Sequence, residues 1–264
     1  MTNTKKTRQR RVALITDTAQ HLGPYLAKEL ARRNHDLVIS DPNVIIEGVE
    51  SSAPDLVNEL RSMDGQVEVV DVDDVNKAGS VQKLVDRAQE VFGGFDSAFI
   101  RPGVHILANF QSATLEKFQG SVEGNMLSVM YALQALLPPL MAQGSGQVLI
   151  EISATGSKDW PGTGFLYGAT RAGAKYMVNN AAIEAAKFGV SVNGMGTMFL
   201  DYPGFRNSTD VADPEVAAEI TKLIPAGRFG KPEEAAHLAA ALLDGECSYY
   251  SAEFINFCGG WTGV

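Results

Sequence analysis

Hydrophobic residues fall into short, nearly continuous runs that alternate with longer stretches of helical periodicity. Short apolar runs are typical of parallel strands covered on both faces, whereas apolar residues at every third or fourth position are typical of helices. The runs predict strands at residues 11–16, 36–40, 66–71, 96–100, 146–152, 191–196 and 253–258. The periodic stretches predict helices at residues 22–33, 55–63, 77–92, within 115–141, 165–188, 214–224 and 232–243, the fourth ending at Pro138 and Pro139.

This alternation predicts an α/β fold with a Rossmann-like, doubly wound parallel sheet of about seven strands flanked by helices. The 264 residues contain no linker, repeat or low-complexity run, so we expect a single domain over residues 11–264 after a flexible basic tail at 1–10. Ligands of such sheets bind at the carboxyl ends of the strands. The expected places for a site are therefore the turns after Thr16, Ile100, Ile152 and Gly196.

The charge balance limits the kinds of partner. A formal net charge of −9 argues against nucleic acid or an anionic membrane surface, and no apolar run reaches the roughly 18 residues of a membrane span. Cys247 and Cys258 lack the spacing of a metal site and are expected to be reduced core thiols of a cytoplasmic protein. The histidines form no ligand pair and predict no metal: His21, His35, His105 and His237.

The turn after the first strand, residues 16–23 (TDTAQHLG), lacks most of the glycines that a dinucleotide needs. Glycines there permit a tight turn and let backbone N–H groups approach a pyrophosphate at the helix N-terminus. Only Gly23 remains, while Asp17 would repel a diphosphate and His21 would occupy its volume. Asp17 or Thr18 can also cap the helix, which is compatible with a lost nucleotide site. The turn therefore predicts that no cofactor binds.

A serine, a tyrosine and an arginine near the fifth strand form the candidate catalytic group. Ser153 closes that strand, and Tyr167 and Arg171 follow at the i, i+4 spacing that places two side chains on one helix face. A cation next to a phenol stabilises the phenolate, which makes Tyr167 a candidate general base. Tyr and Arg at this spacing also occur on ordinary amphipathic helices, so it is Ser153 at the end of the strand that favours catalysis.

These features resemble the short-chain dehydrogenase/reductase superfamily over nearly the whole chain. The resemblance also includes LLPPLM before the fifth strand and FCGGW near the end. Within the superfamily the pattern is similar to the halohydrin dehalogenases, which carry Arg in place of the catalytic Lys and lose the glycine-rich turn. Two features depart from them. His21 stands where they have Phe or Tyr, and thirteen rather than twelve residues separate Ser153 from Tyr167. One extra residue in the loop would explain the spacing, and Thr155 is a less suitable substitute for Ser153.

The resemblance implies cofactor-independent conversion of vicinal haloalcohols to epoxides with halide release, and the reverse opening of epoxides by azide, cyanide or nitrite. In that reaction Tyr167 removes the hydroxyl proton, Ser153 binds the oxygen and Arg171 supplies positive charge. The expected partners are a small haloalcohol or epoxide and a halide or other small anion. The expected halide site comprises His21, whose protonated form would attract an anion, with Thr197, Met198, Phe199 and Leu200. The expected substrate side comprises Trp160, Phe165 and Tyr202.

Two other interpretations stay open: an NAD(P)-dependent short-chain reductase with an atypical cofactor turn, and a non-enzymatic relative that binds a small ligand. The resemblance also implies a homotetramer built through the helices that contain Asn125 and Tyr167. Asn125 itself is expected to be structural. Trp261, near the C-terminus, could reach a neighbouring subunit's pocket, although local packing is the more frequent arrangement.

Overall fold

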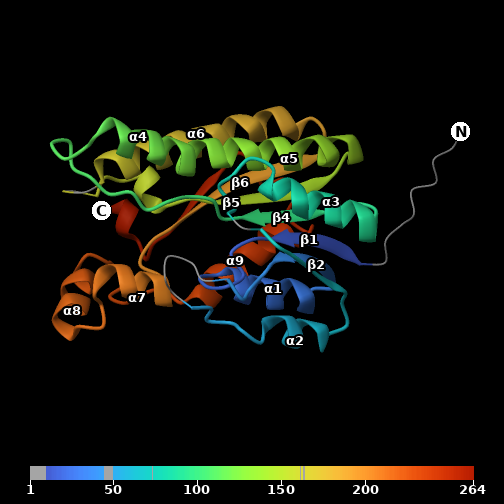
Figure 1. Cartoon of the computed structure of the whole chain (residues 1–264), viewed down its shortest axis with the longest axis horizontal. Coiled ribbons are helices and arrows are strands. Elements are labelled where there is room, and N and C mark those ends of the chain that lie inside the picture. Colours follow the sequence, from blue (N-terminus) through green and yellow to red (C-terminus); the bar gives the residue numbers. More distant parts are fainter. Residues whose placement is uncertain (1–9, 45–49, 73, 161, 163) are drawn as a thin grey trace, which may run out of the picture.

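The computed structural model describes residues 10–44, 50–72, 74–160, 162 and 164–264. The predicted basic tail lies outside these residues, apart from Arg10. The described residues from Arg11 on form one layered α/β unit (Figure 1).

A seven-stranded sheet lies at the centre of the molecule, in the order β3-β2-β1-β4-β5-β6-β7, and every neighbouring pair of strands is parallel. The strands are β1 (Arg11–Ile15), β2 (His35–Ser40), β3 (Val67–Val70), β4 (Ser97–Ile100), β5 (Gly146–Glu151), β6 (Val190–Thr197) and β7 (Phe254–Phe257). The predicted doubly wound fold is confirmed. The winding direction reverses between β1 and β4, and such reversals leave a crevice at the carboxyl ends of the strands.

Helices cover both faces of the sheet (Figure 1). One face carries α3 (Ser80–Phe92), α4 (Leu115–Val122), α5 (Ser128–Gln143) and α6 (Phe165–Ala186), and the other carries α1 (Gly23–Arg32), α2 (Leu56–Arg61) and α9 (Pro232–Leu243). Two short helices that follow β6, α7 (Pro203–Thr209) and α8 (Pro214–Lys222), lie together at one end of the molecule. The sequence pattern did not predict α7.

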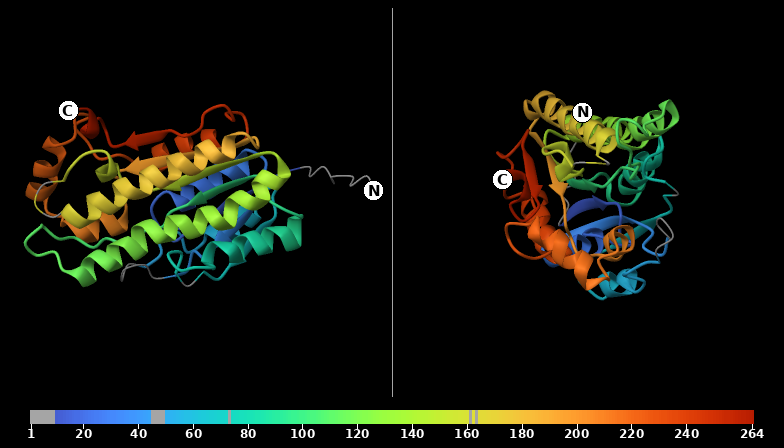
Figure 2. Two further views of the ribbon diagram at one scale, coloured as in Figure 1. Left: turned by 90° about the horizontal axis from the view of Figure 1, so that it is seen from above. Right: turned by 90° about the vertical axis from the view of Figure 1, so that its left-hand side faces the viewer.

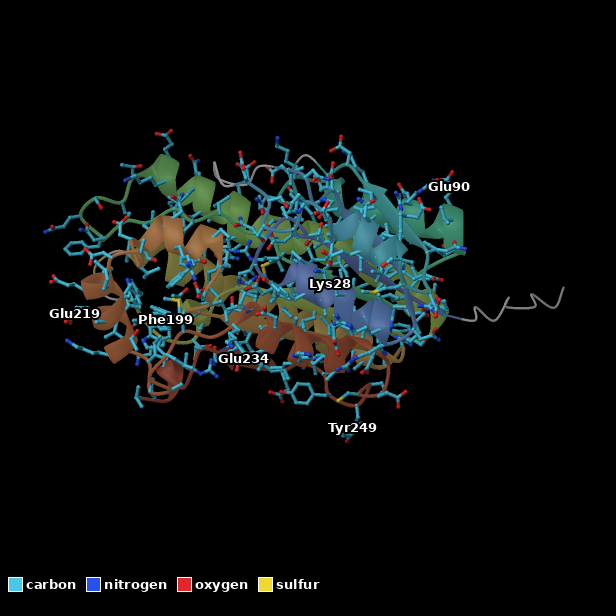
Figure 3. The ribbon with its side chains drawn as sticks, turned by 90° about the horizontal axis from the view of Figure 1, so that it is seen from below. Lys28, Glu90, Phe199, Glu219, Glu234 and Tyr249 are labelled. Carbon is cyan, nitrogen blue, oxygen red and sulfur yellow. The ribbon has the colours of Figure 1, made fainter. Side chains whose placement is uncertain are left out.

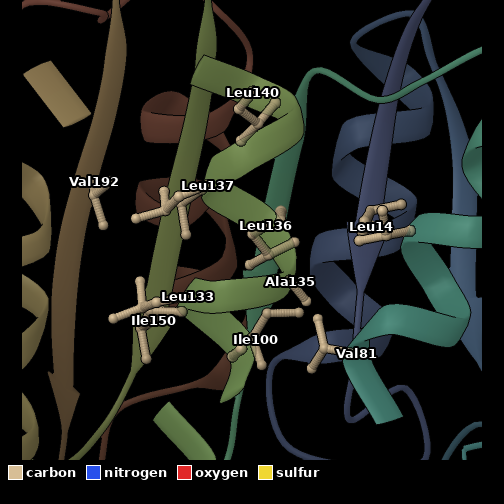
Figure 4. Packing of buried hydrophobic residues seen from close by; sticks show 14 of the residues in the cluster. Leu14, Val81, Ile100, Leu133, Ala135, Leu136, Leu137, Leu140, Ile150 and Val192 are labelled. Carbon is tan, nitrogen blue, oxygen red and sulfur yellow. The ribbon is translucent and has the colours of Figure 1, made fainter. Parts of the chain in front are cut away.

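Helix α5 anchors the larger core. Leu133, Leu136 and Leu140 lie over the sheet beside Ile100 of β4 and Ile150 of β5 (Figure 4). All five side chains are at most 6% exposed. Burying one such side chain contributes about 1.5–3 kcal/mol, so this contact fixes α5 against the centre of the sheet.

The predicted end of this helix at Pro138 and Pro139 is wrong, because α5 continues through both prolines to Gln143. A proline inside a helix removes a hydrogen bond and costs about 3 kcal/mol or more. Burial of the neighbouring leucines offsets that cost. The helix ends instead at Gly144, which has a φ of 80° and donates its N–H to the Leu140 carbonyl.

The helical segment Leu115–Gln143 is, by length and composition, apolar enough to cross a membrane. In this fold it lies on the sheet beside α6 (Figure 2). Its buried leucines pack on strands, as described above, so the segment acts as the core helix of a globular domain.

The C-terminal residues pack locally. Trp261 is 5% exposed, with its ring 5.9 Å from that of Trp160 and 5.8 Å from that of Phe199. Phe199 lies at the end of the molecule that carries α7 and α8 (Figure 3). Cys258 joins this apolar cluster, but Cys247 is exposed, so only one of the two cysteines is the predicted core thiol.

Candidate functional site

A cavity of about 360 Å³ opens at the carboxyl ends of the central strands. All but one of the predicted site residues line it: Ser153, Tyr167, Arg171, His21, Thr197, Met198, Phe199, Leu200, Trp160 and Tyr202. Phe165 does not belong to the lining and is 56% exposed at the start of α6, so its predicted place in the pocket is not observed.

Ser153 follows β5 and caps a short 3-10 helix, Ala154–Gly156. Its hydroxyl oxygen accepts hydrogen bonds from the Thr155 hydroxyl at 2.9 Å and from the Thr155 N–H at 3.3 Å. Because both contacts use the oxygen as acceptor, the Ser153 hydrogen can be donated to a ligand in the cavity. Thr155 is thus a supporting residue that sequence reasoning considered only as a substitute. The longer spacing to Tyr167 still leaves both side chains in one cavity.

Tyr167 and Arg171 lie on consecutive turns of α6, as their spacing predicts. The guanidinium carbon of Arg171 is 5.0 Å from the centre of the Tyr167 ring, and the guanidinium donates a 2.9 Å hydrogen bond to the Pro102 carbonyl. His105 packs edge-on against the Tyr167 ring, with 5.0 Å between ring centres. Arg171 is only 6% exposed, so its charge acts on Tyr167 with little screening by water.

The loop after β4 makes room for this arginine. Gly103 has a φ of 138°, and a Cβ built there would lie 2.0 Å from Nη2 of Arg171. Asn125 accepts a 2.9 Å hydrogen bond from the Val104 N–H and donates one of 3.0 Å to the Thr170 hydroxyl. Its amide therefore ties the loop to α6, which agrees with the predicted structural role.

A cluster of charged side chains, of which the two carboxylates are buried, forms another part of the cavity wall. Arg101, directly after β4, lies 2.7 Å from Glu151 (Nε to Oε2) and 3.2 Å from Asp17 (Nη1 to Oδ2). Glu151 also accepts a hydrogen bond from the Thr197 hydroxyl. Sequence reasoning missed Arg101 and Glu151. The only signal was a charged residue at the end of each of two strands that are otherwise almost wholly apolar.

His21 belongs to the same cluster. Its Nδ1 lies 3.7 Å from Glu151 and 4.0 Å from Asp17, and its ring packs edge-on against Tyr202 at 4.5 Å. Burial, with a further contribution from Arg101, holds the pKa of His21 well below its ordinary value of 6.5. The idea that a protonated His21 attracts an anion is therefore wrong, because the ring is neutral near neutral pH.

Two further pKa shifts describe the cavity wall. Burial raises the pKa of Glu151, against the opposing attraction of Arg101. Burial also raises the pKa of Tyr202 to about 12, so this phenol keeps its proton near neutral pH and is unsuited to act as a base. Of the two tyrosines in the cavity, Tyr167 is the candidate for proton transfer.

Replacing Gly103 by alanine should cost more stability than the same change at Gly79. Both positions have positive φ, but a Cβ at Gly79 meets nothing within 4 Å whereas one at Gly103 meets Arg171. We expect about 1 kcal/mol for Gly79→Ala and about 2–4 kcal/mol for Gly103→Ala, measured by urea denaturation. Adding Arg171→Ala to Gly103→Ala should recover part of the loss. Equal costs at the two glycines would contradict the close approach of Arg171.

Stability should also fall as the pH drops below about 6.5, in part because of His21. The folded chain resists protonating this ring, so in acid the unfolded chain binds the additional proton and unfolding is favoured. Above pH 6.5 the contribution of His21 to the free energy of unfolding is fully present. Below pH 6.5 it decreases by up to about 1.4 kcal/mol per pH unit. His21→Asn, which tolerates the left-handed backbone, should flatten this slope in denaturation curves compared with wild type. Glu151 titrates in the opposite sense and is present in both proteins, so an unchanged slope would contradict the neutral buried ring.

Comparison with known proteins identifies the family. The family model for enoyl-(acyl carrier protein) reductase matches residues 18–262. The chain is 30% identical over 254 residues to 2,5-dichloro-2,5-cyclohexadiene-1,4-diol dehydrogenase LinX of Sphingobium indicum, covering 96% of both chains. It is 30% identical over 255 residues to levodione reductase of Leifsonia aquatica, covering 95% of this chain and 93% of the relative.

Solved structures agree. The crystal structure of levodione reductase matches with a TM-score of 0.83 and 26% identity over 96% of this chain and 98% of the other. A gluconate 5-dehydrogenase from Burkholderia cenocepacia, in complex with NADP and tartrate, matches with a TM-score of 0.80, 21% identity and 96% coverage of both chains, which shows a shared fold.

These relatives overturn the prediction of a halohydrin dehalogenase. Their names describe dehydrogenases and reductases rather than carbon–halide lyases. The predicted epoxide chemistry is therefore wrong, and with it the halide role given to His21 and to residues 197–200. Arg171 and the filled first turn, on which that prediction rested, therefore do not establish a dehalogenase. The chain belongs to the short-chain dehydrogenase/reductase family.

Proposed function

We propose that the protein is an oxidoreductase that acts at a hydroxyl or carbonyl group of a small molecule. The observation that carries this proposal is the convergence of Ser153, Tyr167 and Arg171 in one cavity, in a family whose matching members are named dehydrogenases and reductases. Apolar side chains such as Trp160 and Met198 line the same cavity, which favours a substrate with a partly apolar body. The relative named for a cyclohexadiene-diol supports a cyclic alcohol or ketone as the substrate class.

The geometry of the cavity supports the following proton transfer. Ser153 donates its hydrogen to the substrate oxygen and fixes that oxygen next to Tyr167. In the reductive direction Tyr167 gives its proton to the carbonyl oxygen as charge develops there, and in the oxidative direction it accepts the hydroxyl proton. Arg171, held by the Pro102 carbonyl, stabilises the phenolate that remains after the proton has left Tyr167.

The family implies a nicotinamide dinucleotide as hydride carrier, but the turn after β1 does not fit its pyrophosphate. Asp17 and His21 both have a φ of 58°, the left-handed backbone conformation that glycine adopts easily. Both side chains are buried, and they occupy volume that would stay empty if glycine stood at these positions. Asp17 also places a carboxylate where the diphosphate charge would lie. The chain's own residues therefore support the proposed proton transfer and leave the hydride step undefined.

This misfit favours a second candidate function, a relative that binds a small ligand without redox chemistry. In that case Tyr167 and Ser153 would serve as hydrogen-bond partners of the ligand. The two candidates differ in whether nicotinamide absorbance changes when alcohols or ketones are added.

The test is turnover with cyclic alcohols and ketones, including levodione, in the presence of NAD(H) or NADP(H) at millimolar concentration. Because the filled first turn opposes the pyrophosphate, we expect wild type to turn over at least one of them only at millimolar cofactor. Tyr167→Phe should lower kcat/KM by about 10²–10⁴-fold because the transferred proton is lost. Tyr249→Phe is the matched control, since Tyr249 is fully exposed and should change nothing.

Two results would count against an oxidoreductase. One is that no combination of substrate and cofactor is turned over and that NADH fluorescence stays unchanged on mixing with the protein. This result would favour the ligand-binding relative. The other is full activity of Tyr167→Phe, which would remove Tyr167 from the reaction.

A homotetramer is part of the same proposal. Apolar side chains remain exposed on the outer helices, among them Tyr176 and Ile183 of α6 and Leu115 of α4. In light scattering after size exclusion we expect a tetramer for wild type and a smaller species for Ile183→Glu, because a charge there would be buried in the contact. Leu223→Glu, directly after α8, should leave the mass unchanged. A monomeric wild type would contradict this assembly.

A further inference from the structure

Part of the cavity is not used by the proton transfer. Gln20, His21, Arg101 and Glu151, here called the polar subsite, come from the turn after β1 and from the carboxyl ends of β4 and β5, and all line the same cavity as Ser153 and Tyr167. In a short-chain dehydrogenase with a glycine-rich turn, space beside this turn would take the cofactor's pyrophosphate. In this chain the space presents protein side chains to whatever fills the cavity.

The polar subsite contains buried groups that lack hydrogen bonds. Gln20 is 3% and His21 is 2% exposed, and within the described part of the chain neither Oε1 of Gln20 nor Nδ1 of His21 has a hydrogen-bond partner. A buried polar atom without a partner costs about 1–3 kcal/mol. Oε1 of Gln20 also lies close to Gly204, where a built Cβ would be 2.9 Å away from it. A ligand group that bonds to these atoms would recover the cost.

The charges of the cluster select the kind of group. One guanidinium, Arg101, is shared by the carboxylates of Asp17 and Glu151, and His21 is neutral. These groups carry one more negative than positive charge, which disfavours an anion directly beside them. A hydroxyl group can donate to Oε1 of Gln20 and can donate to or accept from the neutral imidazole, according to its tautomer.

We propose that the polar subsite binds a second hydroxyl group of a neutral substrate, so that the ligand is a small diol or hydroxyketone. One oxygen would lie at Ser153 and Tyr167 and the other at Gln20 and His21. The position of the reacting oxygen rests on the proposed function, whereas the selection of a second hydroxyl rests on the polar subsite alone. Binding of the second hydroxyl can therefore be measured without turnover.

The experiment is calorimetric titration of the protein with cyclohexanol and with the 1,2-, 1,3- and 1,4-cyclohexanediols. We expect at least one diol to bind roughly tenfold more tightly than cyclohexanol, because it satisfies the buried groups of the polar subsite. Gln20→Met, which keeps the length of the side chain and removes the amide, should reduce that preference to near unity. Gln89→Met, at an exposed position of α3, is the matched control and should keep it.

If Gln20→Met does not fold, His21→Phe offers the same test while it keeps a ring against Tyr202. Equal affinity of wild type for cyclohexanol and all three diols would overturn the proposal, and so would tighter binding of inorganic pyrophosphate than of any diol. A preference for a diol without any turnover would leave this inference standing and remove the proposed function. Turnover without a preference for any diol would support the proposed function and overturn this inference.

Discussion

The site depends on the ion pairs that Arg101 forms with two carboxylates. It lies directly after β4, beside the point where the sheet reverses its winding, and it joins Asp17 of the first turn to Glu151 at the end of β5. Its backbone N–H also donates to the Thr16 hydroxyl at 2.9 Å. Two buried carboxylates at this depth would repel each other strongly without a cation, since removing one member of a buried ion pair typically costs about 3–5 kcal/mol. The arginine thus allows the first turn to be filled with charged and aromatic side chains.

The fold could be predicted from the sequence because each strand and helix has a hydrophobic pattern within its own segment, and these patterns alternate along the chain. Each strand run, such as residues 146–152, is mostly apolar, and each observed strand begins and ends within one residue of its predicted limits. The prediction failed where tertiary packing overrides a local rule. Pro138 and Pro139 signal a helix end, but Leu136 and Leu140 are buried against the sheet on either side of them and hold the helix together.

The site was predictable only in part. Spacing alone placed Tyr167 and Arg171 on one helix face, and the end of a strand placed Ser153 at the cavity. Arg101 and Glu151 are separated by about 50 residues in the chain, so their pairing depends on the neighbouring positions of β4 and β5 in the sheet. The charge state of His21 was equally hidden, because it depends on burial and on Arg101 rather than on the residue type.

The reaction class could not be read from the catalytic residues because a proton carrier serves several reactions. Ser153, Tyr167 and Arg171 line one cavity, and these three groups are compatible with hydride chemistry, with epoxide chemistry or with binding alone. What separates these outcomes is the occupant of the space beside the first turn. In this chain that space is enclosed by a neutral imidazole, an amide and a paired carboxylate, and we propose that these groups, rather than the tyrosine, select the molecules that the cavity binds.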